Sequence, residues 1–171
     1  NPGLKPERSR SLDVGVEHAM AGSTLIADAT FFANRYDDLI VTVSGAFAGS
    51  SRYRTDNIAN ARARGLEVGA RWHPIDAVAI RTAWTWLDTE ILGVDGATSE
   101  APFPYQVGDQ LIRRPRHQVS FEAGWSHARG SAFVLLNGRG TVRDIEPNFA
   151  AEVFDNPGYV TVAVGGALRL T

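Results

Sequence analysis

Arginines are the residues in this sequence best suited to bind a ligand. Sixteen of the 17 basic residues are Arg, and Lys5 is the single lysine. They gather in two clusters, Arg52, Arg54, Arg62 and Arg64, then Arg113, Arg114 and Arg116. A guanidinium group binds carboxylates and phosphates through parallel hydrogen bonds. The clusters therefore predict either contact with an anionic ligand or pairing with carboxylates of the protein itself.

Aromatic residues in two segments rich in Gly, Ser, Pro and Asp could stack on such a ligand or enclose it. Phe103 and Tyr105 lie in the segment 93–110, and Phe149 and Phe154 lie in the segment 143–158. Exposed connections commonly carry binding residues. The ligand-binding candidates are therefore Arg52, Arg54, Arg62, Arg113, Arg114, Phe103 and Tyr105.

Covalent catalysis and metal chemistry find little support in the sequence. The four His residues are dispersed, Cys is absent, and neither a Gly-x-Ser-x-Gly motif nor a phosphate-binding loop occurs. Asp37 and Asp38 are adjacent carboxylates that suit a hard cation, but they are too few for a site. We therefore expect no enzyme, no cofactor and no metal. A net charge of −2 gives no reason to expect a nucleic-acid partner.

The elements that position these residues are strands, because apolar and polar residues alternate along nearly the whole chain. The alternation predicts seven strands and no helix, around residues 12–17, 25–34, 66–72, 78–86, 118–125, 132–142 and 160–170. Ala61 and Ala63 have the opposite parity to Leu66, which predicts a β-bulge near Arg64 and Gly65. No apolar run is long enough for a transmembrane helix.

Short and long connections alternate along the predicted meander. The short ones are 21–23, 73–76 and 127–130, and the long ones are 44–51, 93–110 and 143–158. An up-and-down meander has this pattern when its two ends face different compartments, as in transmembrane β-barrels. A soluble sandwich mixes long and short connections without that regularity.

Three tryptophans favour the same interpretation. Trp72, Trp86 and Trp125 all lie on the apolar parity of their strands. Trp86 lies ten residues beyond Asp76, a rise of about 25 Å in a tilted strand, which matches the apolar band between two aromatic girdles. We therefore expect these three residues to form a membrane girdle; the alternative is that each packs in an ordinary core.

The strand positions between the apolar ones carry charged residues. A small closed core could not bury these residues without pairing each of them. If the apolar side chains meet lipid, this polar set lines a wide interior. The reverse orientation describes a soluble β-sandwich. Coordinates that seal Val14, Phe121 and Val162 into one dry interior would decide for the sandwich.

Four short motifs follow one another in the first 117 residues. They are NPGLKPERS at 1–9, YDDLI at 36–40, Tyr53 with Asn57 and Ala61 before Gly65-Leu66-Glu67, and RPRH at 114–117. In this order they resemble the β-barrel of TonB-dependent outer-membrane receptors. The resemblance covers most of the chain and becomes weaker after Asn137.

The resemblance implies an all-β fold, an antiparallel up-and-down meander of about seven strands within a barrel of about twenty-two strands. Residues 1–171 would form part of that barrel, towards its C-terminal end. The plug domain, the energy-coupling box and the aromatic-ended closing strand of the family are not found in these residues. Contact with the TonB complex would therefore come through a plug outside this segment.

The resemblance also implies a location and partners. The protein would lie in the bacterial outer membrane, among lipid and lipopolysaccharide. It would bind a nutrient chelate, an anionic metal chelate such as a ferric siderophore, and import it with TonB-supplied energy. The arginines could instead pair with plug or loop carboxylates or with lipopolysaccharide phosphates at the outer rim. The alternatives are a passive porin-like channel and a soluble β-sandwich binding module.

Overall fold

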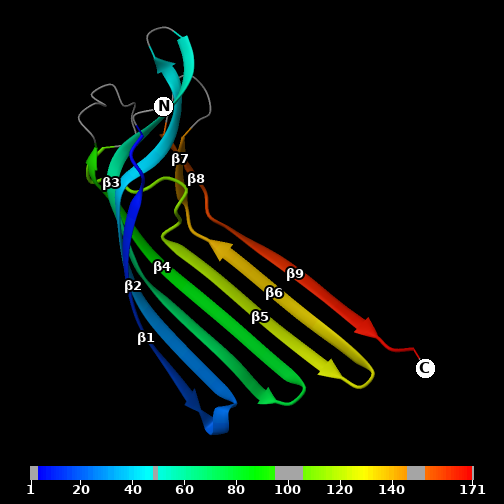
Figure 1. The fold of residues 1–171 in the computed structure, drawn as a ribbon. Coiled ribbons are helices and arrows are strands. Elements are labelled where there is room, and N and C mark those ends of the chain that lie inside the picture. Colours follow the sequence, from blue (N-terminus) through cyan, green and yellow to red (C-terminus); the bar gives the residue numbers. More distant parts are fainter. Residues whose placement is uncertain (1–3, 48–49, 95–105, 146–152, 171) are drawn as a thin grey trace.

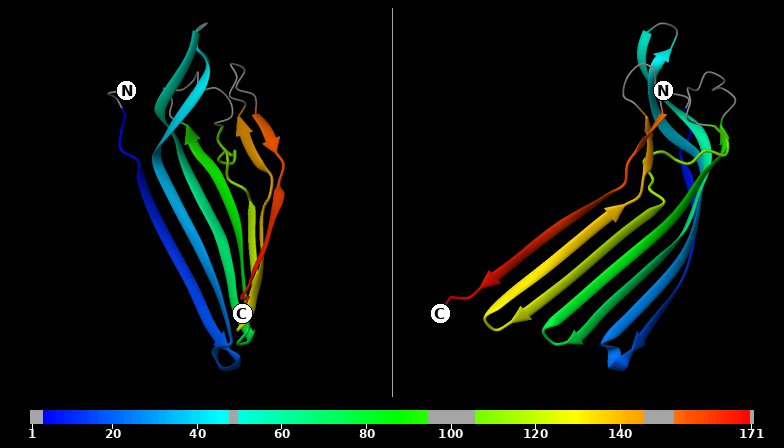
Figure 2. Two further views of the ribbon diagram at one scale, coloured as in Figure 1. Left: turned by 90° about the vertical axis from the view of Figure 1, so that its right-hand side faces the viewer. Right: turned by 180° about the vertical axis from the view of Figure 1, so that it is seen from behind.

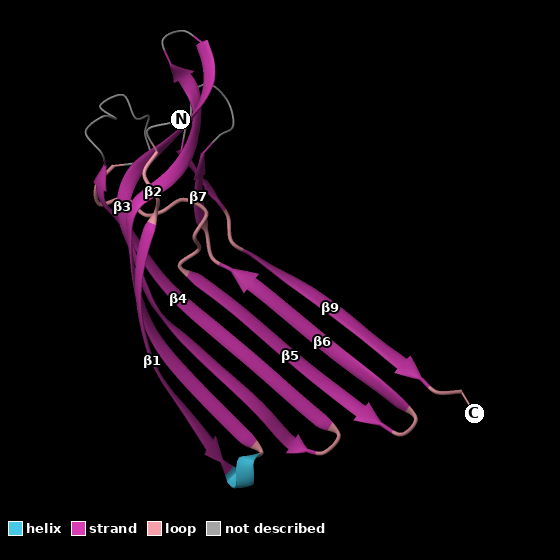
Figure 3. Ribbon diagram, in the orientation of Figure 1, coloured by secondary structure: helices cyan, strands magenta, loops and turns pink. Residues whose placement is uncertain are grey.

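The computed structural model describes residues 4–47, 50–94, 106–145 and 153–170, most of which form strands (Figure 3). The strands are β1 (Arg8–Met20), β2 (Leu25–Phe47), β3 (Ser50–Ile75), β4 (Val78–Val94), β5 (His117–His127), β6 (Gly130–Arg139), β7 (Val142–Ile145), β8 (Val153–Asn156) and β9 (Tyr159–Leu168). One turn of 3-10 helix, η1 (Ala21–Ser23), connects β1 to β2. No helix in these ranges is long and apolar enough to cross a membrane.

Seven strands form one antiparallel meander in the order β1-β2-β3-β4-β5-β6-β9 (Figure 1), which confirms the predicted topology. The structure adds strand pairing in two segments expected to be loops. Within 143–158, β7 pairs with β8 as a separate two-stranded sheet. Within 44–51, the strands β2 and β3 stay paired as far as Phe47 and Ser50. This paired part extends beyond the rest of the sheet (Figure 1).

The connections divide between the two ends of the sheet (Figure 2). The 3-10 turn and the turns at 76–77 and 128–129 lie at one end, which we call the short-turn end. The paired tip of β2 and β3 and the β7–β8 hairpin lie at the other, which we call the long-connection end. The predicted alternation of short and long connections is therefore confirmed for the described residues.

Side chains alternate between an apolar face and a polar face of this sheet. On the apolar face, the register places Val14, Phe31, Leu66 and Trp86 side by side across β1 to β4. The polar face carries the intervening residues, which on these strands include Asp13, Asp28, Thr30, Glu67, Arg71 and Thr85.

The apolar face packs against no second layer of described residues. Val14 is 61% exposed and Val162 is 65% exposed, and Phe121 is half-buried on the same face. A β-sandwich would enclose all three between two sheets. The soluble β-sandwich interpretation is therefore wrong for this chain.

The β-bulge predicted near Arg64 and Gly65 is also wrong. Both residues pair in unbroken register with β2 and with β4. The register shifts lie elsewhere, at 36–40 on β2 and at 60–61 on β3 towards the long-connection end, and at 72–75 on β3 at the short-turn end. Ala63 lies on the same polar face as Gly65. The apparent change of parity between Ala63 and Leu66 therefore arises because a small apolar residue occupies the polar face, and the strand does not change phase there.

Candidate ligand-binding site

Two of the predicted arginines lie on β3 and have acidic partners on β4. Arg62 forms an ion pair with Glu90, and Arg64 Nε lies 3.1 Å from Asp88 Oδ2. The register puts both arginines on the apolar face, in the same alternation as Leu66. Arg62 therefore does not converge with the candidates that lie on the opposite face.

Four other candidates are placed only in part. The backbone of Arg52 and Arg54 belongs to the extended part of β3, paired with the end of β2. Their side chains, and the whole of Phe103 and Tyr105, lie outside the part of the chain that the structure describes. Their roles stay predictions.

Residues 106–116, which we call the β4–β5 arm, lie beside β4 near the long-connection end. The amide of Ile91 donates a hydrogen bond to the carbonyl of Asp109 at 2.8 Å. The amide of Leu111 donates to Thr89 Oγ1 at 3.1 Å, and Thr89 is only 5% exposed. Backbone and side-chain bonds thus fix the position of the arm against β4.

The arm is also bound to β7. The amide of Arg113 donates to the carbonyl of Arg143 at 2.8 Å, and Arg113 Nε lies 2.7 Å from Asp144 Oδ1. In the reverse direction, Arg143 Nη1 lies 3.3 Å from Asp109 Oδ1. The guanidinium of Arg113 therefore has a partner within the protein, whereas Arg114 takes part in no ion pair of the described residues.

A cavity of about 590 Å³ opens between this arm and the polar face. Its polar lining residues are Asn34, Tyr36, Thr89, Arg113 and Arg114. Its apolar lining residues are Phe32, Leu39, Ile40, Ala63, Leu87, Leu111 and Ile112. Apolar walls with a few converging polar groups are typical of small-molecule sites. Of the predicted ligand-binding residues, the structure brings Arg113 and Arg114 together here.

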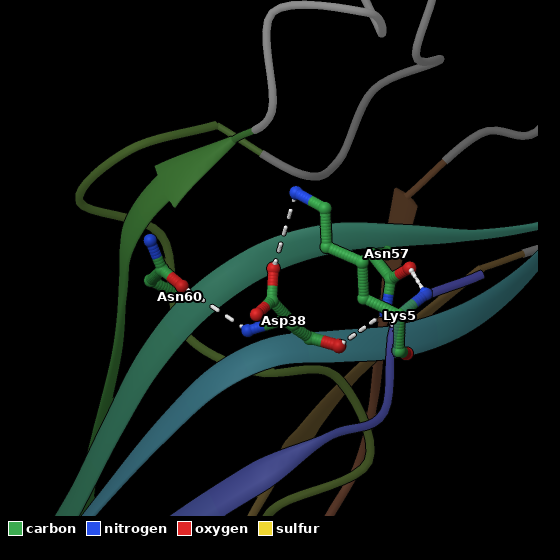
Figure 4. A network of polar contacts seen from close by, with 4 residues as sticks. All are labelled: Lys5, Asp38, Asn57 and Asn60. Carbon is green, nitrogen blue, oxygen red and sulfur yellow. Dashed lines mark hydrogen bonds and ion pairs between the residues drawn. The ribbon is translucent and has the colours of Figure 1, made fainter. Parts of the chain in front are cut away.

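Three of the sequence motifs meet beside Leu39 of this cavity (Figure 4). Asn57 Nδ2 donates to the carbonyl oxygens of Asp38 at 2.6 Å and Lys5 at 2.9 Å, and Asn57 Oδ1 accepts from the Lys5 amide at 2.7 Å. Asn60 Oδ1 accepts from the Asp38 amide at 3.2 Å. Asp38 has a left-handed φ of 58° at the register shift of β2. We call these four polar residues the rim node.

The carboxylates of Asp37 and Asp38 both have basic partners. Asp37 Oδ1 lies 3.4 Å from Arg35 Nε, and Asp38 Oδ1 lies 3.9 Å from Lys5 Nζ. Within the described ranges, no three His, Asp or Glu side chains gather as a metal site would require. The acidic pair therefore belongs to the structure of the rim.

A single family accounts for the whole chain. The family model described as TonB dependent receptor-like, beta-barrel, matches residues 1–171. The chain belongs to the TonB-dependent receptor β-barrel family. No curated protein matches the sequence closely enough to count as a relative.

Solved receptor structures have the same fold as this barrel segment. The copper transporter OprC has a TM-score of 0.71 at 18% identity, over 99% of this chain and 24% of its own. The siderophore receptor PiuA from Acinetobacter baumannii has 0.70 at 15%, over 95% and 22%. The ferric yersiniabactin uptake receptor FyuA from Yersinia pestis has 0.68 at 14%, over 96% and 23%. The chain thus spans 22–24% of the length of these proteins.

The three tryptophans predicted to form a girdle all lie on the apolar face of this TonB-dependent receptor segment. Trp72 and Trp125 lie on the apolar face near the short-turn end, and Trp86 lies on it further along β4. Their contact with a membrane stays a prediction. Two histidines add ring contacts on this face, with ring centroids 5.9 Å apart in Trp84–His117 and 6.0 Å apart in Trp125–His127.

Sequence reasoning missed most of the cavity lining. Asn34 and Tyr36 have the polar parity of β2, which could have assigned them to the same face as Thr89. The arm offers no such signal, because residues 106–116 do not alternate. Its position depends on hydrogen bonds to β4 and β7 that only the folded chain displays.

Proposed function

We propose that this chain is a wall segment of an outer-membrane receptor that binds an anionic metal chelate, such as a ferric siderophore, and imports it with TonB-supplied energy. The observation that carries the proposal is the separation of an exposed apolar face from a polar face in a chain of this family. The apolar face meets lipid and the polar face lines the barrel interior. The receptor works by binding and gated passage, without covalent chemistry.

The cavity under the β4–β5 arm supports an anionic cargo. Phe32 and Tyr36 supply ring surfaces, and Arg114 supplies a guanidinium group that takes part in no ion pair of the described residues. A guanidinium group suits the carboxylate or catecholate oxygens of a metal chelate. Arg113 holds the arm through Asp144 and so acts on the cargo through the shape of the cavity.

The test uses the complete protein encoded by the reading frame that contains this segment. It is produced in a bacterial host that lacks its own ferric siderophore receptors, with and without functional TonB. Uptake of radiolabelled iron is measured with catecholate, hydroxamate and carboxylate siderophores in turn. We expect saturable uptake of one class that disappears without TonB. Non-saturable uptake that persists without TonB would instead establish a passive porin-like channel.

A pair of variants tests the cavity. Arg114→Gln removes the cation at the cavity, and we expect cargo affinity to fall about tenfold, since a charge-assisted hydrogen bond is lost. Arg129→Gln is the matched control, because Arg129 is an exposed residue in the turn at the short-turn end. Equal affinity of the two variants for the chelate would reject the cavity as the binding site.

A further inference from the structure

Arginines of three neighbouring strands stand side by side on the apolar face. The register pairs Arg10 of β1 with Arg35 of β2, and Arg35 with Arg62 of β3. Arg8 and Arg64 lie two residues away on their strands and share this face. We call these five residues the arginine row. Their convergence comes from the pairing of strands, because they are far apart in the sequence.

Carboxylates only partly balance this row. Three of the five arginines have an acidic partner: Arg35 with Asp37 at 3.4 Å, Arg62 with Glu90, and Arg64 with Asp88 at 3.1 Å. Arg8 and Arg10 are exposed and take part in no ion pair of the described residues. Like charges directly opposite one another on neighbouring strands repel. The row therefore has a net positive charge that an external anion would stabilise.

The polar face shows a different balance. Arg71 Nη2 lies 2.9 Å from Glu17 Oε2, and Arg81 Nη1 lies 4.0 Å from Glu122 Oε2. On that face, each of these arginines has its own carboxylate. The arginines of the row without an ion pair, Arg8 and Arg10, both lie on β1, next to the paired Arg35 of β2.

The height of the row matches the headgroup layer of a membrane. Leu66 lies opposite Trp86, and Arg62 lies four residues before Leu66 on β3, towards the long-connection end. In a strand tilted by about 40°, four residues rise about 10 Å. If the tryptophans mark the edge of the hydrocarbon, the row lies among lipid headgroups, within the reach of an arginine side chain. The long connections of such barrels face the cell exterior.

We propose that the arginine row binds the phosphate groups of lipopolysaccharide in the outer leaflet. Guanidinium groups bind phosphate oxygens in a bidentate manner, and neighbouring strands space them to contact one phosphorylated headgroup from several sides. The inference rests on the proposed outer-membrane location. It adds a lipid site on the outer surface, separate from the cargo cavity on the polar face.

The test uses the complete receptor, purified in detergent and freed of lipid. Binding of lipid A is measured by native mass spectrometry and by the rise in melting temperature. For Arg10→Gln/Arg35→Gln we expect about thirtyfold weaker binding of lipid A, from the loss of two basic contacts at the membrane surface. The control Arg71→Gln/Arg81→Gln removes the same charge from the polar face and keeps the parent affinity.

Two comparisons define the ligand. Dephosphorylated lipid A and phosphatidylglycerol are each offered in place of lipid A, and we expect both to bind far more weakly. Equal binding of either lipid, or unchanged lipid A binding by the double variant, would overturn the proposal. Arg10→Gln alone removes no protein ion pair, so it serves as the test if the double variant does not fold.

The same variants separate this inference from the proposed function. Arg10→Gln/Arg35→Gln leaves the cargo cavity intact, so chelate uptake is expected to stay at the parent level. A parent receptor that binds lipid A but imports no chelate would contradict the proposed function alone. A receptor that imports its chelate but binds lipid A equally in parent and variant contradicts the lipid site alone.

Discussion

Asn57 links the N-terminal segment, β2 and β3, and its replacement should weaken the wall at the long-connection end. Its side chain forms three hydrogen bonds, two with the backbone of Lys5 and one with that of Asp38. Each such bond contributes about 0.5–1.5 kcal/mol. Because water can replace part of each bond in this exposed region, we expect Asn57→Ala to lower the free energy of unfolding by about 2 kcal/mol. Asn60→Ala removes a single bond of 3.2 Å and should cost about 0.5 kcal/mol.

The substitution Asn57→Asp distinguishes hydrogen bonding from side-chain size. It keeps the acceptor for the Lys5 amide but places a carboxylate oxygen against two carbonyl oxygens. We expect it to destabilise at least as much as Asn57→Ala at neutral pH, and less at acid pH, where a protonated carboxyl can donate again.

Urea unfolding of the complete receptor in detergent, followed by gel mobility of unheated samples, measures these effects. The urea concentration at the unfolding midpoint should be highest for the parent, lower for Asn60→Ala and lowest for Asn57→Ala. If Asn57→Ala unfolds at the same urea concentration as Asn60→Ala, the three bonds contribute nothing beyond one, and the reasoning about the rim node is refuted.

Two further pairs of substitutions test the packing of the sheet and the direction of its faces. Gly65→Ala should destabilise by about 1–3 kcal/mol in the same assay, because a Cβ there would lie 2.2 Å from the Trp86 carbonyl oxygen. Gly124→Ala, whose Cβ would meet nothing closer than 3.9 Å, should be nearly neutral. Val162→Arg on the apolar face should cost about 2–4 kcal/mol in lipid vesicles, whereas Thr161→Arg on the polar face should cost little; equal losses would show that the apolar face does not meet lipid.

Strand alternation predicted the meander and the direction of most side chains, because a period of two is a local property of the chain. The same alternation could have placed Arg62 on the apolar face with Leu66. Arg62 thus lies apart from Arg113 and Arg114, and its contact with a ligand stays a prediction. Glu90 and Asp88 lie directly opposite Arg62 and Arg64 on the same face and form ion pairs with them.

Features that depend on distant contacts were beyond local reasoning. The β4–β5 arm has no periodicity, and ion pairs with β7 hold it. The register shift at 36–40 needs a left-handed Asp38. Asn57 and Asn60 of β3 form hydrogen bonds with the Asp38 backbone. The sequence around residue 38 gives no sign of these partners.

The rim node also explains what the family motifs do in this chain. Lys5, Asp38 and Asn57 come from three of the motifs, and their described polar contacts are with one another and with the Asn60 side chain. They shape the wall near the long-connection end, next to the cavity that Arg114 lines. Receptors named for copper, for a siderophore and for ferric yersiniabactin share this wall fold at 14–18% identity. A wall whose motifs fix its shape can keep its fold while the cavity lining changes with the ligand.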